Sequence, residues 1–462
     1  MGLESLPPGP SLGPLRQTLR FARDPCGFQE ECARRHGDLF TLRLLAQPPT
    51  VYLGSPEGVK ELLAQSPRDF RAGEGAAVLR FLLGPRSLTC LDGEPHSRDR
   101  KLMMPPLHGE RLLGYGARMR ELTARIVKNW RPGEPVSLVT EAKRITLEVF
   151  LDCVVGIPEG PTRDRFRALL LAYLDLCMRP VSLAVWSLLP GEALRRRLTA
   201  AARLADRLPG PLQRSLPLAL ARVVRDLDAT ILEYIAAKRR QPDAGDVISQ
   251  LITARDENGV ALTDAELHDE MLTLLVGGHE TTATSLAFAL QEIALHPEVH
   301  ERILAECKVV LGEGGLDPAH VKELGYLEAT VKEALRLHPI APGFLRKLAR
   351  PMRFRAYELP QGTGVAGSMH LVHRHPTVWP EPGRFVPERF LGLRPKPYEY
   401  FPFGGGVRTC IGMAFGLFEM KIVLATILAR LRLELVGAPA EARLHGVLWG
   451  ASNAILARAR AA

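Results

Sequence analysis

The chain has 462 residues, of which 46% are hydrophobic and 24% are charged, and its formal net charge is +9. This length and composition indicate a globular protein with a large core, built as one large domain or as two. No stretch interleaves basic clusters with aromatic residues, so the charge does not indicate a nucleic-acid partner. It fits either a basic face that attracts an acidic protein or scattered solvated side chains.

Cysteine usage and the N-terminal segment predict a cytoplasmic protein. The seven cysteines include no C-x-x-C pair, which argues against a disulfide framework and a zinc ribbon. The N-terminal stretch MGLESLPPGPSLGPLRQTLRF has prolines and glycines where a secretory signal needs a continuous apolar run. The most apolar long segment, residues 169–190, contains Asp175, Arg179 and Pro180, so we expect no membrane span.

Helical periodicity dominates the chain. Apolar residues recur three or four apart in residues 111–130, 141–156 and 226–240, with charges on the opposite face. Between residues 354 and 369, turn signals separate short runs, which predicts small hairpins. Because no repeat and no low-complexity linker divides the sequence, we predict a mainly α fold with small β-sheets.

The clearest predicted helix begins at Thr263, with a capping box in T-D-A-E, and runs to about His296, where Pro297 stops it. Its apolar circumference suggests that it crosses the middle of the molecule. Gly277 and Gly278 stand at its centre, and each costs about 1 kcal/mol relative to alanine. Either another helix packs closely there or a ligand approaches the backbone, and the helix alone favours packing.

Two partial motifs are excluded by their context. His279 and Glu280 begin the zinc motif H-E-x-x-H, but Ala283 occupies the position of the second histidine. Residues 362–367 match G-x-G-x-x-G without the strand-then-helix setting of a dinucleotide site, so a hairpin turn is expected.

Residues 401–412, FPFGGGVRTCIG, place Cys410 directly before the strongly apolar helical pattern IGMAFGLFEMKIVLATILARL. A helix N-terminus favours the thiolate form of a cysteine through its dipole and free N–H groups. The neighbouring glycines, among them Gly404 and Gly412, allow a flat, bulky group to lie against the backbone. The alternative is a buried structural cysteine in a glycine-rich turn.

The pattern Phe403-x-x-Gly406-x-Arg408-x-Cys410-x-Gly412 resembles the haem-binding loop of the cytochrome P-450 superfamily, and the match is complete. The resemblance implies haem b, with Cys410 as the axial ligand of the iron and Phe403, Arg408 and Gly412 as haem-binding residues. It also implies a single domain over residues 1–462 with β-containing portions near 36–60 and 350–375, and a long central helix over the haem.

Three further residues resemble the ionic triad of this superfamily. Glu333 and Arg336 form its E-x-x-R motif, and Arg389 lies in its P-E-R-F partner segment. A bare E-x-x-R is often a surface ion pair worth a few tenths of a kcal/mol. The position upstream of Cys410 favours a structural triad instead.

The central helix resembles the oxygen-binding groove of the superfamily. Gly277 and Gly278 would let dioxygen fit beside the backbone, and Glu280 and Thr281 correspond to the acid–alcohol pair. Glutamate stands where aspartate is more usual, which leaves the reach of the acid open. Thr281 is the firmer of the two catalytic assignments.

The family resemblance implies four cations for the haem propionates. His96 and Arg100 match an H-x-x-x-R helix motif and lie four residues apart on one face, and Arg346 and Arg408 match two further propionate arginines. For each of them the alternative is an ordinary surface side chain.

The resemblance implies a monooxygenase that inserts one oxygen atom of O2 into a C–H bond of a hydrophobic small molecule, such as a fatty acid, terpenoid or steroid. Residues 92–112 and 403–421 look like those of bacterial members related to fatty-acid hydroxylases. The expected lining, around residues 70–83, 169–189, 272–281 and 340–345, is largely apolar. Since no reductase module is visible after Leu435, the electrons of NAD(P)H should arrive through a ferredoxin reductase and a ferredoxin, and we expect a monomer.

Three other functions remain open on the same fold: a peroxide-driven peroxygenase, a haem-dependent isomerase or dehydratase, and a non-catalytic haem-binding sensor. Glu280 and Thr281 weigh against all three, because peroxygenases and isomerases of this fold tend to alter the acid–alcohol pair and a sensor needs no proton path.

Overall fold

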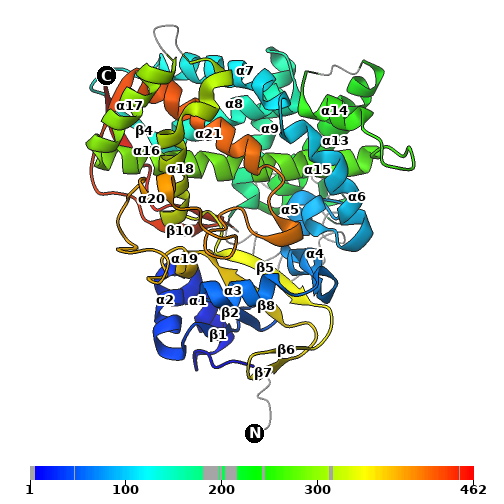
Figure 1. Cartoon of the computed structure of the whole chain (residues 1–462). Coiled ribbons are helices and arrows are strands. Elements are labelled where there is room, and N and C mark those ends of the chain that lie inside the picture. Colours follow the sequence, from blue (N-terminus) through cyan, green and yellow to red (C-terminus); the bar gives the residue numbers. More distant parts are fainter. Residues whose placement is uncertain are drawn as a thin grey trace.

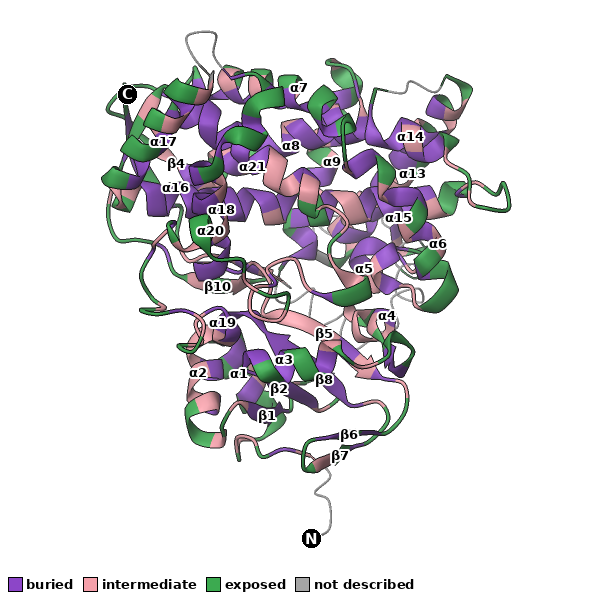
Figure 2. Ribbon diagram, viewed as in Figure 1, coloured by how far each residue is buried: buried purple, intermediate pink, exposed green. Residues whose placement is uncertain are grey.

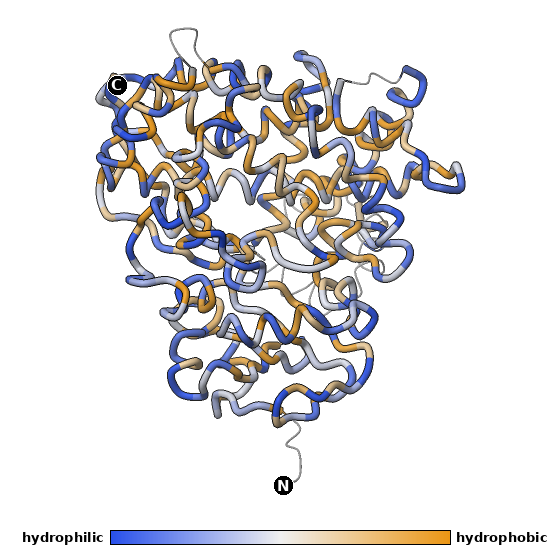
Figure 3. The backbone as a smooth tube through the Cα atoms, in the orientation of Figure 1, coloured by the Kyte–Doolittle hydropathy of each residue, from blue (hydrophilic) through white to orange (hydrophobic). Residues whose placement is uncertain are grey.

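The computed structural model describes residues 6–45, 47–179, 197, 200–202, 216–241, 245–311, 316–446 and 448–461. A large helical part stands on a smaller part that holds the main sheet and the N-terminal helices (Figure 1). Hydrophobic residues are most frequent along the backbone in the interior of both parts, and hydrophilic segments lie mainly at the periphery (Figure 3). The prediction of a mainly helical protein with small sheets is confirmed.

The α-helices in the described ranges are α1 (Pro14–Arg23), α2 (Pro25–His36), α3 (Pro56–Leu63), α4 (Ala72–Gly75), α5 (Arg80–Leu83), α6 (Gly93–Met103), α7 (Arg111–Val127), α8 (Leu138–Val149), α9 (Pro161–Cys177), α13 (Leu216–Arg240), α14 (Val247–Thr253), α15 (Asp264–Leu275), α16 (Thr281–Leu295), α17 (Pro297–Leu311), α18 (Gly325–Leu337), α19 (Met369–Val372), α20 (Arg389–Gly392) and α21 (Met413–Leu428). Two π-helical turns, η5 (Phe150–Val155) and η6 (Val276–Glu280), extend α8 and join α15 to α16. Among these helices, none in the described ranges has the length and apolarity needed to cross a membrane.

The main sheet joins segments that are distant in the sequence. Its five strands follow the order β1 (Leu39–Leu42), β2 (Thr50–Leu53), β8 (Gly364–Ser368), β5 (Gly343–Leu348) and β3 (Phe70–Arg71). Only β2 and β8 pair in parallel. The glycines of β8 make room for a large neighbour, because a Cβ on Gly367 would lie 2.6 Å from the Phe344 ring of β5. This pairing fixes the register of β5 and with it the position of Arg346, which faces Val365.

The remaining strands form three small sheets. Of the small hairpins predicted between residues 354 and 369, the described residues contain one, formed by β6 (Met352–Phe354) and β7 (Tyr357–Leu359). The expectation that residues 362–367 form only a hairpin turn is wrong, because residues 364–368 form β8, which pairs with β2 and β5 in the main sheet. A second pair consists of β10 (Ala442–His445) and β11 (Leu448–Ala451), and the third sheet has the order β4 (Pro135–Ser137), β12 (Leu456–Ala461) and β9 (Leu431–Leu435).

The predicted central helix exists, but it is not a continuous α-helix. Thr263 and Glu266 form the expected capping box at the start of α15, and α16 ends at Leu295, two residues before α17 begins at Pro297. Between α15 and α16 the turn η6 has π-helical hydrogen bonding. The three elements run across the helical part (Figure 1), and α16 is buried along most of its length (Figure 2). Single π-turns inside helices are frequent at functional sites, and the alternation of apolar residues gave no sign of this one.

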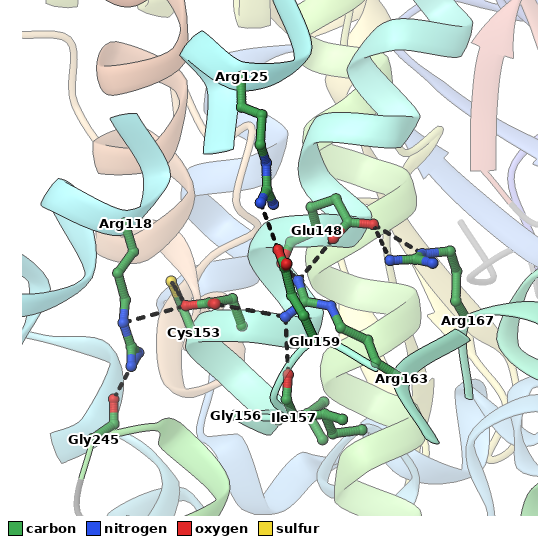
Figure 4. Close-up of polar contacts among 12 residues, drawn as sticks. Arg118, Arg125, Glu148, Cys153, Gly156, Ile157, Glu159, Arg163, Arg167 and Gly245 are labelled. Atoms are coloured by element: carbon green, nitrogen blue, oxygen red, sulfur yellow. Dashed lines mark hydrogen bonds and ion pairs between the residues drawn. The ribbon is translucent and has the colours of Figure 1, made fainter. Parts of the chain in front are cut away.

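A buried arginine links α8, η5 and α9 (Figure 4). Arg163 is almost fully buried, and its guanidinium donates to the Ile157 carbonyl over 2.9 Å and to Glu148 Oε2 over 2.7 Å. Asp152 lies between Arg163 and Arg118, at 3.6 and 3.3 Å from their guanidinium nitrogens. The network therefore fixes the connection that follows α8.

Arg336 forms the most completely buried ion pair of the predicted sites. Arg336 and Glu333 of α18 are both 0% exposed, and two hydrogen bonds of 2.7 and 2.8 Å join them. Arg389 adds a longer contact of 3.4 Å to Glu333. The other donors of Arg336 reach the carbonyls of His373 (2.8 Å), Pro382 (2.8 Å) and Arg384 (3.0 Å). All five guanidinium donors are thus satisfied, which is the condition for keeping a charge in the interior.

We expect Arg336→Ala to lower the free energy of unfolding by about 3–5 kcal/mol, because it leaves Glu333 buried without its main partner. Urea denaturation measures this change. The matched control is Arg384→Ala, which removes an exposed ion pair with Glu381 and should change stability by less than about 1 kcal/mol. Equal effects of the two variants would contradict the structural role of Arg336.

Candidate functional site

The loop before α21 has a backbone that requires glycine at two positions. Gly404 and Gly406 have φ angles of +72° and +67°, a region that side chains strongly disfavour. The loop closes through two hydrogen bonds of 2.9 Å, from Gly404 N–H to the Phe401 carbonyl and from Cys410 N–H to the Phe403 carbonyl. The glycine cluster noted in the sequence therefore serves to turn the chain and present Cys410.

Cys410 lies at the start of α21, as predicted, with the backbone N–H groups of Gly412 and Met413 directed at its sulfur. Burial raises the pKa of the Cys410 thiol, and these N–H groups and the charge of Arg100 only partly oppose that effect. The N–H groups at the helix end favour the thiolate, as expected, but desolvation outweighs them in the protein alone. A bound metal cation deprotonates a coordinating thiol outright.

Cys410 has an accessible side chain in a closely packed environment. Its side chain keeps accessible surface, although the protein surrounds it closely enough for burial to raise its pKa. A side chain that lines a cavity inside the protein combines accessible surface with close surroundings in this way.

Four predicted propionate-binding residues gather around the Cys410 loop. Arg346 is buried and donates to the Gly405 carbonyl over 2.7 Å, and burial, with a smaller contribution from the charge of Arg408, lowers the pKa of Arg346 to about 10. Burial also lowers the pKa of Arg100, and burial together with the charge of Arg100 lowers the pKa of Arg408. Mutually repelling, partly desolvated cations of this kind are the arrangement expected of an anion site.

Asp92 neutralises part of this cluster. Its carboxylate lies 2.6 Å from the Arg408 guanidinium and accepts the backbone N–H groups of Gly73 and Glu74. Arg408 also donates to the Leu88 carbonyl over 3.3 Å. The sequence gave no signal for Asp92, which lies one position before α6.

His96 belongs to the cluster as a neutral group. Burial, together with Arg408 and Arg100, lowers the pKa of His96 to about 4, so the ring carries no charge near neutral pH. The expectation that His96 is one of four cations is therefore wrong for the protein alone, and the ring can act there as a hydrogen-bond donor.

The centre of the long helix faces open space on one side. Gly277 and Gly278 are exposed, whereas their neighbours in the helix, Val276 and His279, are buried. A Cβ placed on either glycine would meet nothing within 4 Å. The prediction from the helix alone, that another helix packs against these glycines, is therefore wrong, and the ligand alternative fits. Thr281 keeps partial exposure, and its hydroxyl donates to the Gly277 carbonyl one turn earlier.

The Glu280 side chain is directed away from the exposed glycines and toward α8. Its carboxylate forms an ion pair with Lys143 of α8, at 2.9 and 3.1 Å from the two oxygens. Lys143 was not among the predicted residues, because a lysine on the polar face of an amphipathic helix is indistinguishable in sequence from a solvated charge.

The helix that follows Cys410 contacts the helix that follows the two glycines. Gly416 of α21 packs against α16, since a Cβ on it would lie 3.9 Å from the Thr282 hydroxyl. A flat group with anionic substituents and a metal for the sulfur of Cys410 therefore fits the residues present: one thiol with directed N–H groups, a cluster of cations, and two glycines without neighbours.

Comparisons with known proteins identify the family. The cytochrome P450 family model matches residues 5–456. The chain is 33% identical over 432 residues to cytochrome P450 135B1 of Mycobacterium tuberculosis, an alignment that covers 93% of this chain and 86% of the relative. It is 32% identical over 439 residues to cytochrome P450 135A1 of the same species, covering 94% and 90%.

Solved structures agree on the fold. A cyanobacterial CYP120A1 with bound retinoic acid superposes with a TM-score of 0.83 at 25% identity, covering 100% of both chains. The haem domain of cytochrome P450DA superposes with a TM-score of 0.81 at 23% identity, covering 100% of this chain and 98% of that one. The chain therefore belongs to the cytochrome P450 family, and the enzyme is a haem-thiolate monooxygenase.

We expect Cys410→Ala to abolish the thiolate-type carbon-monoxide difference spectrum of the reduced protein, because none of the other described cysteines starts a helix beside a glycine-rich loop. The control is Cys32→Ala, which changes a buried cysteine of α2 and should leave the spectrum unchanged. A thiolate spectrum that survives in Cys410→Ala would overturn this assignment.

Proposed function

We propose that Cys410 is the axial ligand of haem b and that the surrounding cluster holds the haem. In this proposal Arg100, Arg346 and Arg408 pair with the propionates and His96 donates a hydrogen bond to them. The remaining contacts with the haem come from Phe403, Gly412, Gly277 and Gly278. The single observation that carries the proposal is the group of partly desolvated cations around a cysteine that lines an open space. Glu333, Arg336 and Arg389 stabilise the segments that lead to this loop.

The haem supplies the activation of O2 and the transfer of one oxygen atom to the substrate. The chain's own residues position the reactants and supply protons. Thr281 is proposed to place its hydroxyl beside dioxygen, since it is the partly exposed polar side chain next to the open glycines. Glu280 is proposed to bring protons from the α8 side, where Lys143 holds its carboxylate.

We propose hydroxylation of a hydrophobic small molecule such as a fatty acid, terpenoid or steroid. Apolar side chains that keep accessible surface occur in three of the predicted lining segments: Val78 and Leu79, Leu274, and Ile340 and Leu345. Of the fourth segment, residues 180–189 lie outside the described residues. The similar CYP120A1 structure contains retinoic acid, an apolar chain that ends in a carboxylate, which supports this class.

A spectral titration with lipids, terpenes and steroids tests the substrate class. A compound that fills the site expels solvent and changes the spin state of the haem. Saturable shifts from apolar compounds support the proposal, and shifts confined to small polar compounds would contradict it.

Electrons are proposed to come from NAD(P)H through a ferredoxin reductase and an acidic ferredoxin. Basic side chains stand near the Cys410 loop: Lys60 and Lys396 are exposed, and their ammonium groups lie 5.6 and 5.8 Å from the centre of the Tyr398 ring. Leu63, one turn after Lys60, packs against Gly405. Such charges attract an acidic partner at low ionic strength.

Replacing Lys60 and Lys396 together by glutamate should slow ferredoxin-supported reduction several-fold at low salt, and the difference should shrink as added salt screens the charges. Lys128→Glu, at the C-terminal end of α7, is the matched control and should leave the rate unchanged. Stopped-flow reduction over a salt series measures this. Rates that do not depend on ionic strength would exclude electrostatic steering.

We predict that Thr281→Ala folds normally and binds substrate but loses coupling. Alanine has the better helix propensity, whereas the hydroxyl needed for proton transfer is gone. Reducing equivalents should then appear as hydrogen peroxide, measured as product formed per NAD(P)H consumed. Thr282→Ala, whose hydroxyl faces Gly416, is the control.

Unchanged coupling in Thr281→Ala would move the proton role to Glu280 or to ordered water. It would also strengthen the peroxygenase, isomerase and sensor alternatives. Turnover that hydrogen peroxide supports and reductase does not would favour the first of them directly.

A further inference from the structure

A buried polar cluster lies behind Glu280, where α8 meets η6. Thr146 and His279 are each 1% exposed or less, and Glu280 is 8% exposed. Lys143, one turn before Thr146 on α8, is 33% exposed and so connects the cluster to solvent. The proposed proton path uses Lys143 and Glu280, but it leaves Thr146 and His279 without a role.

His279 has one satisfied and one unsatisfied ring nitrogen. Its Nδ1 lies 2.8 Å from the Thr146 hydroxyl. Its Nε2 is buried and has no hydrogen-bond partner in the described part of the chain. The polar atom that faces it is Glu280 Oε1, at 3.8 Å. An unpaired polar atom in the interior is costly and calls for an explanation.

Lys143 can donate to an oxygen of Glu280 in either form, but it offers no acceptor for the O–H of the protonated acid. Its ammonium group donates hydrogen bonds and accepts none, so it stabilises the carboxylate but cannot receive the proton of a carboxylic acid. A residue that delivers protons must pass through both forms in each cycle. A second partner is therefore needed for protonated Glu280.

We propose that His279, supported by Thr146, is a positioning residue that stabilises Glu280 in both its ionised and its protonated form. This inference rests on the proposed role of Glu280 in proton delivery. His279 does so by changing tautomer, which moves no net charge into the interior.

The Thr146 hydroxyl makes both tautomers possible. When Nε2 carries the proton, it faces the Glu280 carboxylate and Thr146 donates to Nδ1. When Nδ1 carries the proton, it donates to Thr146, whose own hydrogen turns to the Lys143 or His279 carbonyl, each at 3.3 Å. Nε2 then presents a lone pair to the acid proton of Glu280. A hydroxyl can donate and accept, which a methyl group in its place cannot.

The charges around the ring keep it neutral. Burial and Lys143 lower the pKa of His279, and Glu280 raises it, with a result of about 4. Lys143 and Thr146 face the ring from α8, and Glu280 faces it from η6. Near neutral pH the ring therefore responds to Glu280 through its tautomer and not through its charge.

The test removes the Thr146 hydroxyl. In Thr146→Val a protonated Nδ1 would be a buried donor without an acceptor, which is rarer and costlier than an unpaired acceptor. The ring should then keep its proton on Nε2 and support only the carboxylate. We expect the midpoint of Glu280 protonation to fall by about one pH unit, the value of one lost hydrogen bond.

Infrared difference spectra over a pH series measure that midpoint from the carboxyl C=O band, which is assigned by its loss in Glu280→Gln. Thr146→Ser retains the hydroxyl and should behave like the wild type, and Thr146→Ala should shift the midpoint in the same direction as Thr146→Val. Product formed per NAD(P)H consumed should fall in Thr146→Val and Thr146→Ala, most at high pH. Thermal melting shows whether the variants are folded.

Equal midpoints in Thr146→Val and Thr146→Ser would overturn the inference and leave the Thr146–His279 pair as a packing contact. Failure of the proposed function would look different: the midpoint would shift as expected, but Glu280→Gln would turn over with full coupling. In that case His279 would still position Glu280, and the protons would arrive by another route.

Discussion

The buried guanidinium of Arg336 is the interaction on which the geometry of the site depends. It ties α18 to three backbone carbonyls in residues 373–384, a stretch with little regular structure of its own. His373, whose carbonyl Arg336 binds, accepts the N–H of Phe401 through its ring over 2.9 Å. Phe401 in turn begins the loop that ends at Cys410. A charge paired in the core thus fixes the entry of a loop whose own sequence is rich in glycine.

The arginines near Cys410 have fewer charged and hydrogen-bonding partners than Arg336, and this difference has a functional explanation. Arg336 has a partner for every donor, whereas Arg100, Arg346 and Arg408 repel one another and are only partly neutralised, by Asp92. Such a cluster destabilises the chain by itself and gains stability when an anion binds between its members. Together with a thiol whose pKa burial raises, it is arranged for a ligand that brings both negative charge and a metal.

Local signals predicted much of this arrangement. The capping box at Thr263 and the end of the long helix before Pro297 each follow from the chemistry of one or two neighbouring residues, and the structure shows them. Properties that depend on desolvation were not predictable. The sequence could not show that His96 is buried beside two arginines, or that burial outweighs the helix dipole at Cys410. The pairing of Lys143 with Glu280 joins residues far apart in the chain, and the charge pattern of α8 contained no sign of it.

The π-turn η6 explains how one short segment serves two environments. Gly277 and Gly278 face the open space, whereas the next two residues, His279 and Glu280, are buried against α8. Thr281 then returns to partial exposure, with its hydroxyl on the Gly277 carbonyl. An α-helix has 3.6 residues per turn and a π-turn, with its i→i+5 hydrogen bonds, has more, so a pair of residues on one side and a pair on the other fit within a single turn. The same turn therefore has a side without side chains, where we propose that dioxygen approaches the backbone, and a polar side that reaches solvent through Lys143. Thr281 lies at the boundary between the two sides.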